Sequence, residues 1–286
     1  MPRKKWKITL PAYAKLNLYL DVTGKRADGY HEIESVMRAI DLHDVVTVTV
    51  TENGGDGNIT VKCDDPSIPV GAENIAYRAA ALFMEKSGLS FKAEIDIRKR
   101  IPVMAGLGGS STDGAAVLTA LNRIYNAFDA AGLSETGAAL GADVPFCLTG
   151  GTALCKGAGG VITPLPSAAR NFYVIIKPDF GISTKRAYEM YDRLAPVSGP
   201  VSRDMPYNAF QALYKDGRID GICRDLINSG ALGASMTGSG SAVFGVFAER
   251  AAAENACKKL DYPHKFIACD ARRALRGVNE RKGYAV

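Results

Sequence analysis

A glycine-rich turn between a strand and a helix constrains the fold of this chain more than any other stretch. It runs Pro102-Val103-Met104-Ala105-Gly106-Leu107-Gly108-Gly109-Ser110-Ser111-Thr112-Asp113. Residues 93–98 before it alternate apolar and charged side chains, and residues 115–125 after it carry apolar side chains at helical spacing. Such a turn directs unpaired backbone N–H groups and the positive end of a helix dipole at one spot. The stretch therefore predicts a phosphate-binding site or, as the alternative, a structural tight turn.

The turn matches neither of two common phosphate-binding motifs. G-x-x-x-x-G-K-[ST] needs a lysine that Gly109-Ser110-Ser111 lacks, and G-x-G-x-x-G needs glycine at position 111, which is serine. Glycine still has a function here, because an anion can approach a backbone that carries no side chain. The four residues from Ser110 to Asp113 are the candidate N-caps of the helix that follows.

Composition and charge exclude other classes of protein. A chain of 286 residues, 47% of them hydrophobic, can bury the core of one large domain or two medium ones. Its net charge of +5 is too small for a nucleic-acid surface and favours, weakly, an anionic small molecule. No run of 18 apolar residues occurs, and the six cysteines lie far apart without metal-site spacing. We therefore expect a cytoplasmic protein with reduced thiols, no membrane span and no metal cluster.

An alternating strand over residues 8–22 places Lys15 and Asn17 side by side on one face. They either point into a cleft or belong to an ordinary solvated face. The loop that follows, residues 24–31, ends in Tyr30-His31, a pair suited to a flat ring, although a plain surface hairpin is the alternative. Asp143 lies between a turn of small residues and an apolar run, which makes it a candidate base or salt-bridge partner.

Further elements follow from periodicity and turn residues. We expect Asn74 to cap a helix that begins at Ile75, and residues 236–241 to form a second glycine and serine loop, either an anion-binding wall or a tight bend. The remaining predictions are a hairpin of residues 46–51 with 59–63, a short helix from Leu133, a hairpin of 152–155 with 161–163, a strand at 172–176, a helix at 184–194, a helix from Asn208, a strand at 242–247, a helix at 249–260, a strand at 266–268 and a basic segment at 272–276.

Three of these segments together resemble the motifs of the GHMP kinases, the galacto-, homoserine, mevalonate and phosphomevalonate kinases. The segments are residues 11–18 (PAYAKLNL), the turn at 102–111, and residues 236–240 (MTGSG). The resemblance implies an α+β, two-domain GHMP kinase fold with the active site in the cleft between the domains. Residues 1–165 would form an N-terminal, ATP-binding domain like ribosomal protein S5 domain 2, and residues 166–286 a C-terminal ferredoxin-like α/β-plait domain.

Residues 14–18 with 26–31, and residues 141–145, are similar to one branch of this superfamily. That branch transfers the ATP γ-phosphoryl group to the 2-hydroxyl of a cytidine-diphosphate-linked methylerythritol in the non-mevalonate isoprenoid pathway. The resemblance implies that Asp143 is the general base and Lys15 its electrostatic partner. A carboxylate within hydrogen-bond reach can take the hydroxyl proton while an ammonium offsets charge on the transferring group.

The same resemblance assigns the binding residues. ATP would lie with adenine near Asn74 and Ile75, and its phosphates would lie on Pro102, Val103, Met104, Ala105, Gly106, Leu107, Gly108, Gly109, Ser110 and Ser111. Mg²⁺ would lie near Ser110 or Ser111 without a dedicated protein cage. The cytosine ring would contact Tyr30 and Tyr188, with His31 at its hydrogen-bonding edge, and Asn17 and Thr184 would contact the rest of the substrate. Position 188 is tyrosine where relatives often have phenylalanine, which should preserve stacking.

Two other functions remain as alternatives. One is a GHMP kinase for homoserine, mevalonate or a sugar, which Gly29-Tyr30-His31 disfavours. The other is a non-catalytic nucleotide-binding or RNA-binding module, which the presence of both Lys15 and Asp143 disfavours. The partners expected are ATP and the small-molecule substrate, with no nucleic acid and no membrane, and with the chain as a monomer or homodimer.

Overall fold

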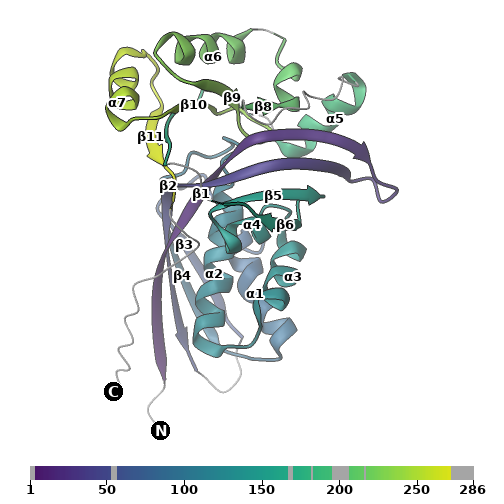
Figure 1. Cartoon of the computed structure of the whole chain (residues 1–286). Coiled ribbons are helices and arrows are strands. Elements are labelled where there is room, and N and C mark those ends of the chain that lie inside the picture. Colours follow the sequence, from purple (N-terminus) through teal and green to yellow (C-terminus); the bar gives the residue numbers. More distant parts are fainter. Residues whose placement is uncertain are drawn as a thin grey trace.

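The structure is a computed structural model that describes residues 4–52, 57–166, 170–181, 183–194, 206–215 and 217–271. The first half of the chain forms β1 (Lys5–Lys25), β2 (His31–Thr51), β3 (Ile59–Cys63), α1 (Ile75–Ser87), β4 (Lys92–Arg98), α2 (Gly109–Tyr125), α3 (Ala130–Leu140), α4 (Val144–Thr149), β5 (Thr152–Gly157) and β6 (Val161–Pro164). The second half forms β7 (Phe172–Ile176), α5 (Thr184–Leu194), β8 (Tyr207–Asn208), the 3₁₀ helix η1 (Ala209–Leu213), α6 (Arg218–Asn228), β9 (Gly233–Met236), β10 (Val243–Phe247), α7 (Arg250–Lys259) and β11 (Lys265–Cys269). Figure 1 shows their arrangement.

Two long antiparallel strands organise the larger sheet. β1 and β2 pair along nearly their whole length, in a sheet ordered β3-β4-β2-β1-β8, and β5 pairs with both β2 and β6. Their hairpin extends past the helices toward α5 (Figure 1). Register shifts interrupt β1 just before Lys15 and just after Asn17. Because such irregularities bend a strand and re-aim side chains, they help to turn both residues inward.

Helices α1 and α2 cover one face of this sheet, with α3 and α4 beside them (Figure 1). Their apolar faces and the sheet share one buried cluster, which includes Leu10, Val48, Phe83, Ile95 and Leu118. α1 begins as expected, because the Asn74 side chain accepts a hydrogen bond from Ala76 N–H at 2.8 Å. This packing fixes the start of α1 and the start of α2 at the same end of the layer.

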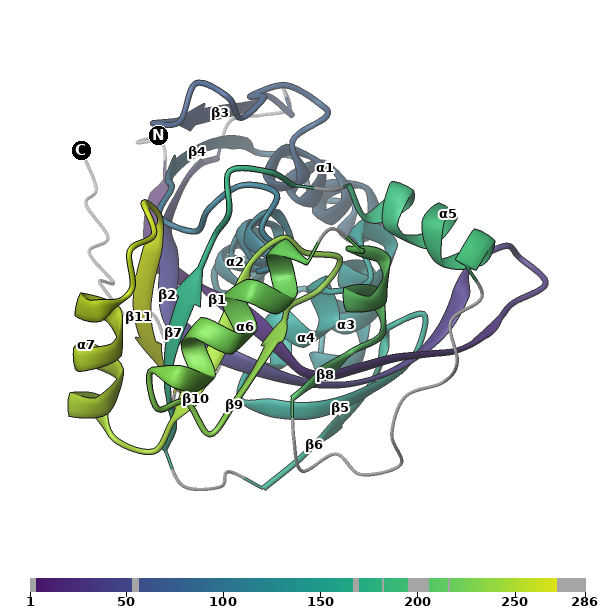
Figure 2. The same cartoon turned by 90° about the horizontal axis from the view of Figure 1, so that it is seen from above.

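A smaller antiparallel sheet, ordered β11-β7-β10-β9, lies over that end. Figure 2 shows α6 crossing above β7 and β10, with α7 beside β11. The core of this part includes Val174, Phe210, Leu226, Val243 and Phe247. β8 joins the larger sheet by pairing with β1, so the two halves of the chain are hydrogen-bonded to each other. Among the described residues, no helix combines the length and apolar character needed to cross a membrane.

The predicted hairpin of residues 46–51 with 59–63 is wrong. β3 pairs parallel with β4, and β4 lies between β3 and β2. The reason is the helix between β3 and β4: a strand–helix–strand crossover returns the chain parallel, and the alternating apolar residues of β4 then fill the place beside β2. Most of the turn predicted for that hairpin, residues 53–56, lies outside the described residues.

Three helix starts also differ from expectation. The N-cap of α2 is Gly108, in the left-handed region at φ 73°, and none of the four predicted side chains caps it. α3 begins at Ala130 rather than Leu133, because Asp129 accepts from Gly132 N–H at 2.8 Å. The helix expected from Asn208 is the short 3₁₀ helix η1. The basic segment at 272–276 lies outside the described residues.

Candidate active site

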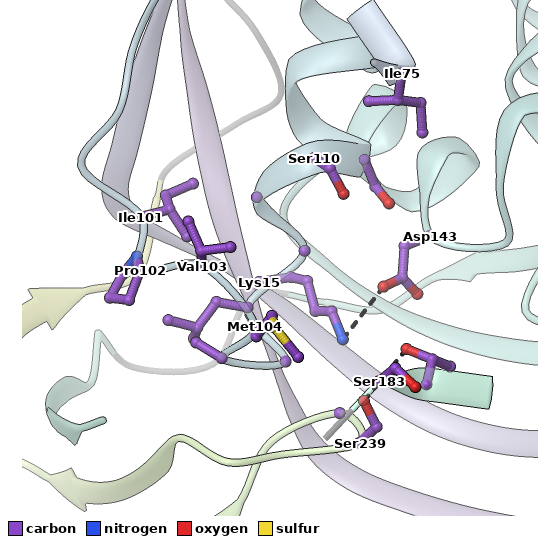
Figure 3. A pocket seen from close by; sticks show the side chains of 18 of the residues that line it. Lys15, Ile75, Ile101, Pro102, Val103, Met104, Ser110, Asp143, Ser183 and Ser239 are labelled. Carbon is purple, nitrogen blue, oxygen red and sulfur yellow. Dashed lines mark hydrogen bonds and ion pairs between the residues drawn. The ribbon is translucent and has the colours of Figure 1, made fainter. Parts of the chain in front are cut away.

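The glycine-rich turn, β1 and the segment before α4 meet around a cavity of about 650 Å³. Its wall includes Lys15, Asp143 and residues 101–111, with Thr184 and Tyr188 from α5. Figure 3 shows these segments facing one another across the cavity, with Ser239 of the second glycine loop at its edge. The fold thus gathers at one place residues that are more than 200 positions apart in the chain.

Lys15 and Asp143 form an ion pair in this cavity. Lys15 Nζ lies 3.3 Å from Asp143 Oδ2, and the pair is drawn as a dashed line in Figure 3. The lysine side chain is only 4% exposed, whereas the aspartate side chain is 29% exposed. Asp143 lies directly before α4, where the backbone fixes its position: Val144 N–H donates to Gly141 O at 3.1 Å. A carboxylate that is open to the cavity and adjacent to a buried ammonium can accept a proton from a bound hydroxyl.

Asn17 anchors Lys15 and links β1 to the second glycine loop. Its Oδ1 accepts from Lys15 Nζ at 2.7 Å and from Gly238 N–H at 2.9 Å, and its Nδ2 donates to Ser35 Oγ at 2.8 Å. The backbone N–H of Asn17 donates to Thr237 Oγ1 at 3.0 Å. Lys15 and Asn17 are both buried, so the solvated-face alternative for this strand is wrong. Asn17 lines the cavity, with its amide held by protein groups.

The glycine-rich turn packs directly against the second glycine loop. Gly106 has φ 74°, and a Cβ added there would lie 2.1 Å from Thr237 O, so both its conformation and its contact require glycine. The turn leads into α2, and no side chain caps that helix. The first backbone N–H groups of a helix have no intrahelical partner, and here Gly109, Ser110 and Ser111 line the cavity. This end of the cavity is therefore suited to phosphate oxygens.

A buried charge network fixes the segment that enters the turn. Lys99 Nζ lies 2.8 Å from Asp113 Oδ2 and also contacts the Asp44 carboxylate. The other oxygen of Asp44 accepts from the backbone N–H groups of Arg100, at 2.5 Å, and Ile101, at 2.8 Å. Burial raises the pKa of Asp113 to about 7, although nearby Lys99 opposes the shift. The network connects the end of β4 to α2 at the end of the cavity that the glycine-rich turn lines, and Lys99 and Asp113 are themselves part of the lining.

At the opposite end of the cavity, the β1–β2 hairpin meets α5. The His31 ring stacks on Tyr188 with centroids 4.6 Å apart, and His31 Nε2 lies 2.6 Å from Asp192 Oδ1. Tyr30, by contrast, is 68% exposed. Tyr188 and Thr184 line the cavity, and the Thr184 hydroxyl lies 3.3 Å from Ser239 Oγ. Aromatic groups of the hairpin and of α5 therefore lie at this end, opposite the glycine-rich turn.

Two family models match the chain. They are the GHMP kinases N terminal domain, over residues 74–151, and the GHMP kinases C terminal, over residues 200–264. A relative from Clostridium perfringens named 4-diphosphocytidyl-2-C-methyl-D-erythritol kinase is 38% identical over 288 residues, covering 94% of this chain and 99% of the relative. A relative of the same name from Acetivibrio thermocellus is 41% identical over 259 residues, covering 84% and 90%.

The chain belongs to the GHMP kinases. Among solved structures, a crystal structure of 4-(cytidine 5'-diphospho)-2C-methyl-D-erythritol kinase is 30% identical with a TM-score of 0.74, covering 92% of this chain and 100% of that one. Homoserine kinase from Cytophaga hutchinsonii shares the fold, at 19% identity and a TM-score of 0.68, covering 95% and 97%. The expected α+β, two-domain GHMP kinase fold is confirmed. As a GHMP kinase, the chain acts on a small molecule and uses ATP as the phosphoryl donor.

The structure places the predicted residues of this GHMP kinase as follows. The residues that line the cavity are Asn74, Ile75, Lys15, Asn17, Asp143, Thr184, Tyr188 and 102–111. Tyr30 and His31, on the β1–β2 hairpin, are not lining residues, although His31 stacks on Tyr188. No cluster of three or more His, Cys, Asp or Glu side chains suited to a metal ion occurs among the described residues. The six cysteines are free thiols.

Sequence reasoning missed two features of this GHMP kinase. The first is the Lys99–Asp44–Asp113 network. The signal in the sequence was Asp113, a charged residue among the small and apolar residues of the first turns of the helix. The second is Asp192, which follows Tyr188 by one helical turn. Its partner His31 is 161 positions away, and periodicity carries no information about contacts at that separation.

Proposed function

We propose that this protein phosphorylates the 2-hydroxyl of 4-diphosphocytidyl-2-C-methyl-D-erythritol with ATP, a step of the non-mevalonate isoprenoid pathway. The observation that carries the proposal is the Lys15–Asp143 pair, 3.3 Å apart, in a cavity that the glycine-rich turn also lines. Relatives of that name, 38% and 41% identical, support the choice of substrate over homoserine, mevalonate or a sugar.

In the proposed mechanism, Asp143 accepts the proton of the 2-hydroxyl as that oxygen bonds to the γ-phosphorus of ATP and ADP leaves. Lys15 offsets the negative charge on the transferring group. The N–H groups of residues 109–111 hold phosphate oxygens at the start of α2. Asn17 keeps the lysine ammonium in place through its 2.7 Å hydrogen bond. The oriented ion pair and the oriented phosphates together account for the acceleration, because phosphoryl transfer depends mainly on positioning and charge.

The residues present could hold Mg²⁺ in the way usual for nucleotide enzymes, with few protein ligands. It would be held by the Ser110 or Ser111 hydroxyl, together with phosphate oxygens of ATP, since Mg²⁺ commonly takes few protein ligands in such sites. The ion would supply positive charge that neutralises the phosphates. Both serines line the cavity at the start of α2, and the described residues there offer no acidic cage.

The binding assignments belong to the same proposal. Asn74 and Ile75 would lie near adenine, residues 102–111 would hold the ATP phosphates, and Tyr30, His31 and Tyr188 would bind the cytosine ring. Asn17 and Thr184 would contact the rest of the substrate. We also propose that residues 1–165 and 166–286 are the two domains, that the protein acts in the cytoplasm, and that it is a monomer or homodimer.

A phosphate-transfer assay tests this function. The purified protein is incubated with ATP, Mg²⁺ and either the cytidyl substrate, mevalonate or homoserine, and the phosphorylated product is identified by ³¹P NMR. We expect turnover of the cytidyl substrate alone. Turnover of mevalonate or homoserine at an equal rate would contradict the proposed substrate. RNA binding without any ATP turnover would contradict a kinase.

A further inference from the structure

Three side chains of helix α5 contact the His31 ring. Tyr188 stacks on its face at 4.6 Å, Tyr191 meets it edge-on with centroids 6.4 Å apart, and Asp192 Oδ1 lies 2.6 Å from Nε2. Positions 188, 191 and 192 share one helix face, because residues three and four apart are neighbours on a helix. A histidine held this closely has a fixed ring orientation.

The same carboxylate also binds the strand opposite His31. Lys25 pairs with His31 across the β1–β2 ladder, and Lys25 Nζ donates to Asp192 Oδ2. The hydrogen bond from Lys25, and then the one from His31, hold the pKa of Asp192 below its usual range. Asp192 is therefore a carboxylate at neutral pH, and a carboxylate only accepts hydrogen bonds.

A carboxylate at Nε2 determines which ring nitrogen carries the proton. In its neutral form the imidazole has one N–H and one lone pair, and a carboxylate at Nε2 then favours the tautomer with the N–H on Nε2 and the lone pair on Nδ1. No described residue contributes a hydrogen bond to Nδ1. In this tautomer His31 carries an acceptor on Nδ1, in a ring that stacks on Tyr188 of the cavity wall.

We propose that Asp192 is a positioning residue that fixes His31 as a hydrogen-bond acceptor and so makes the enzyme select cytosine over uracil. The inference rests on the proposed function, in which a cytidine diphosphate group binds at this end of the cavity. Cytosine carries a 4-amino group that donates to Nδ1, whereas uracil carries a 4-carbonyl oxygen that faces Nδ1 as a second acceptor. Two facing acceptors cannot bond, and the unpaired groups disfavour the wrong base.

The test compares two substrates in four proteins. kcat/KM is measured with the cytidine-diphosphate-linked and the uridine-diphosphate-linked methylerythritol for the wild type, Asp192→Ala, Asp192→Asn and Lys25→Met. We expect the cytidine-to-uridine ratio to fall at least about tenfold in both Asp192 variants, because the imidazole can then adopt either tautomer. Lys25→Met keeps the Asp192–His31 bond and should keep the ratio. The KM for ATP should stay unchanged in all four.

A matched control removes a carboxylate elsewhere. Glu254→Gln changes an exposed ion pair on α7, where Arg250 Nε lies 2.8 Å from Glu254 Oε1, and we expect it to leave both the ratio and the rate unchanged. A second readout follows the proton directly in the free protein. The chain has three histidines, so ¹⁵N NMR of the imidazoles can be assigned. His31 should show the Nε2–H form in the wild type and a mixture in Asp192→Ala.

The outcomes separate the inference from the function on which it rests. A wild type that turns over the cytidine substrate, with Asp192 variants that keep its cytidine-to-uridine ratio, would overturn the role of Asp192 and leave the proposed function intact. A His31 ring with its proton on Nδ1 in the wild type would also overturn it. A wild type that turns over neither nucleotide substrate would overturn the proposed function, and this inference with it.

Discussion

Removal of the Asn17 side chain tests how the site is held together. Asn17→Ala removes the acceptor of the buried Gly238 N–H at 2.9 Å and one acceptor of the Lys15 ammonium at 2.7 Å, whereas Lys15 keeps Asp143 at 3.3 Å. A buried donor left unsatisfied costs about 1–3 kcal/mol, and a lost hydrogen bond to a charged group costs about 1.5–3 kcal/mol. We therefore expect the free energy of unfolding to fall by about 3 kcal/mol. Since Lys15 also loses its anchor, kcat should fall about 10- to 100-fold.

Urea unfolding and steady-state kinetics measure the two effects of Asn17→Ala. Ser35→Ala is the matched control, because it removes the acceptor of Asn17 Nδ2 and the hydroxyl that donates to Tyr19 O but keeps the Lys15 and Gly238 donors satisfied. We expect it to cost about 2 kcal/mol for the two lost hydrogen bonds and to leave kcat within about threefold. The reasoning would be refuted if Asn17→Ala were as stable and as active as Ser35→Ala.

Three further predictions follow from the same geometry. Gly106→Ala should lower the unfolding temperature sharply or prevent folding, because the new Cβ would lie 2.1 Å from a backbone oxygen. Gly160→Ala is the control: it has open space around it and should leave the unfolding temperature in the same thermal scan unchanged. The pKa of Asp113 is raised to about 7, so its contribution to stability is complete below its unfolded pKa of 3.8 and is lost as pH rises through 7. Urea unfolding should therefore show the wild type losing stability relative to Asp113→Asn between pH 4 and 7, and parallel curves would contradict this. Tyr30→Ala should raise the KM for the cytidyl substrate much more than the KM for ATP, and equal changes would count against ring stacking.

Local patterns predicted most of the elements. The strand that ends at Arg98, the hairpin of β5 with β6, and the helix capped by Asn74 all follow from short-range periodicity or capping, and the structure confirms them. The failed hairpin shows the limit of that reasoning. Its two segments are adjacent in the sequence, but the partner of β3 is β4, and a crossover helix separates the two strands. Strand pairing depends on tertiary packing, which a local pattern does not encode.

The candidate site was partly predictable for a similar reason. Alternation alone placed Lys15 and Asn17 on one strand face, but it could not decide between a cleft and a solvated face. The bend of β1 against β2 and the close packing of Gly106 on Thr237, 131 positions away, decide that question, and both depend on tertiary contacts between separate elements. Asp192 went unnoticed because its function depends on a partner in another part of the chain.

The catalytic assignment of Asp143 is tested most directly by Asp143→Asn, with Glu135→Gln as a matched control in an exposed ion pair with Lys86. Single-turnover transfer from ATP to the cytidyl substrate is measured in proteins whose urea unfolding curves match the wild type. We expect the rate to fall about 10²- to 10⁴-fold in Asp143→Asn and to remain unchanged in Glu135→Gln. A folded Asp143→Asn protein that transfers phosphate at the wild-type rate would show that the pair with Lys15 is not the catalytic pair.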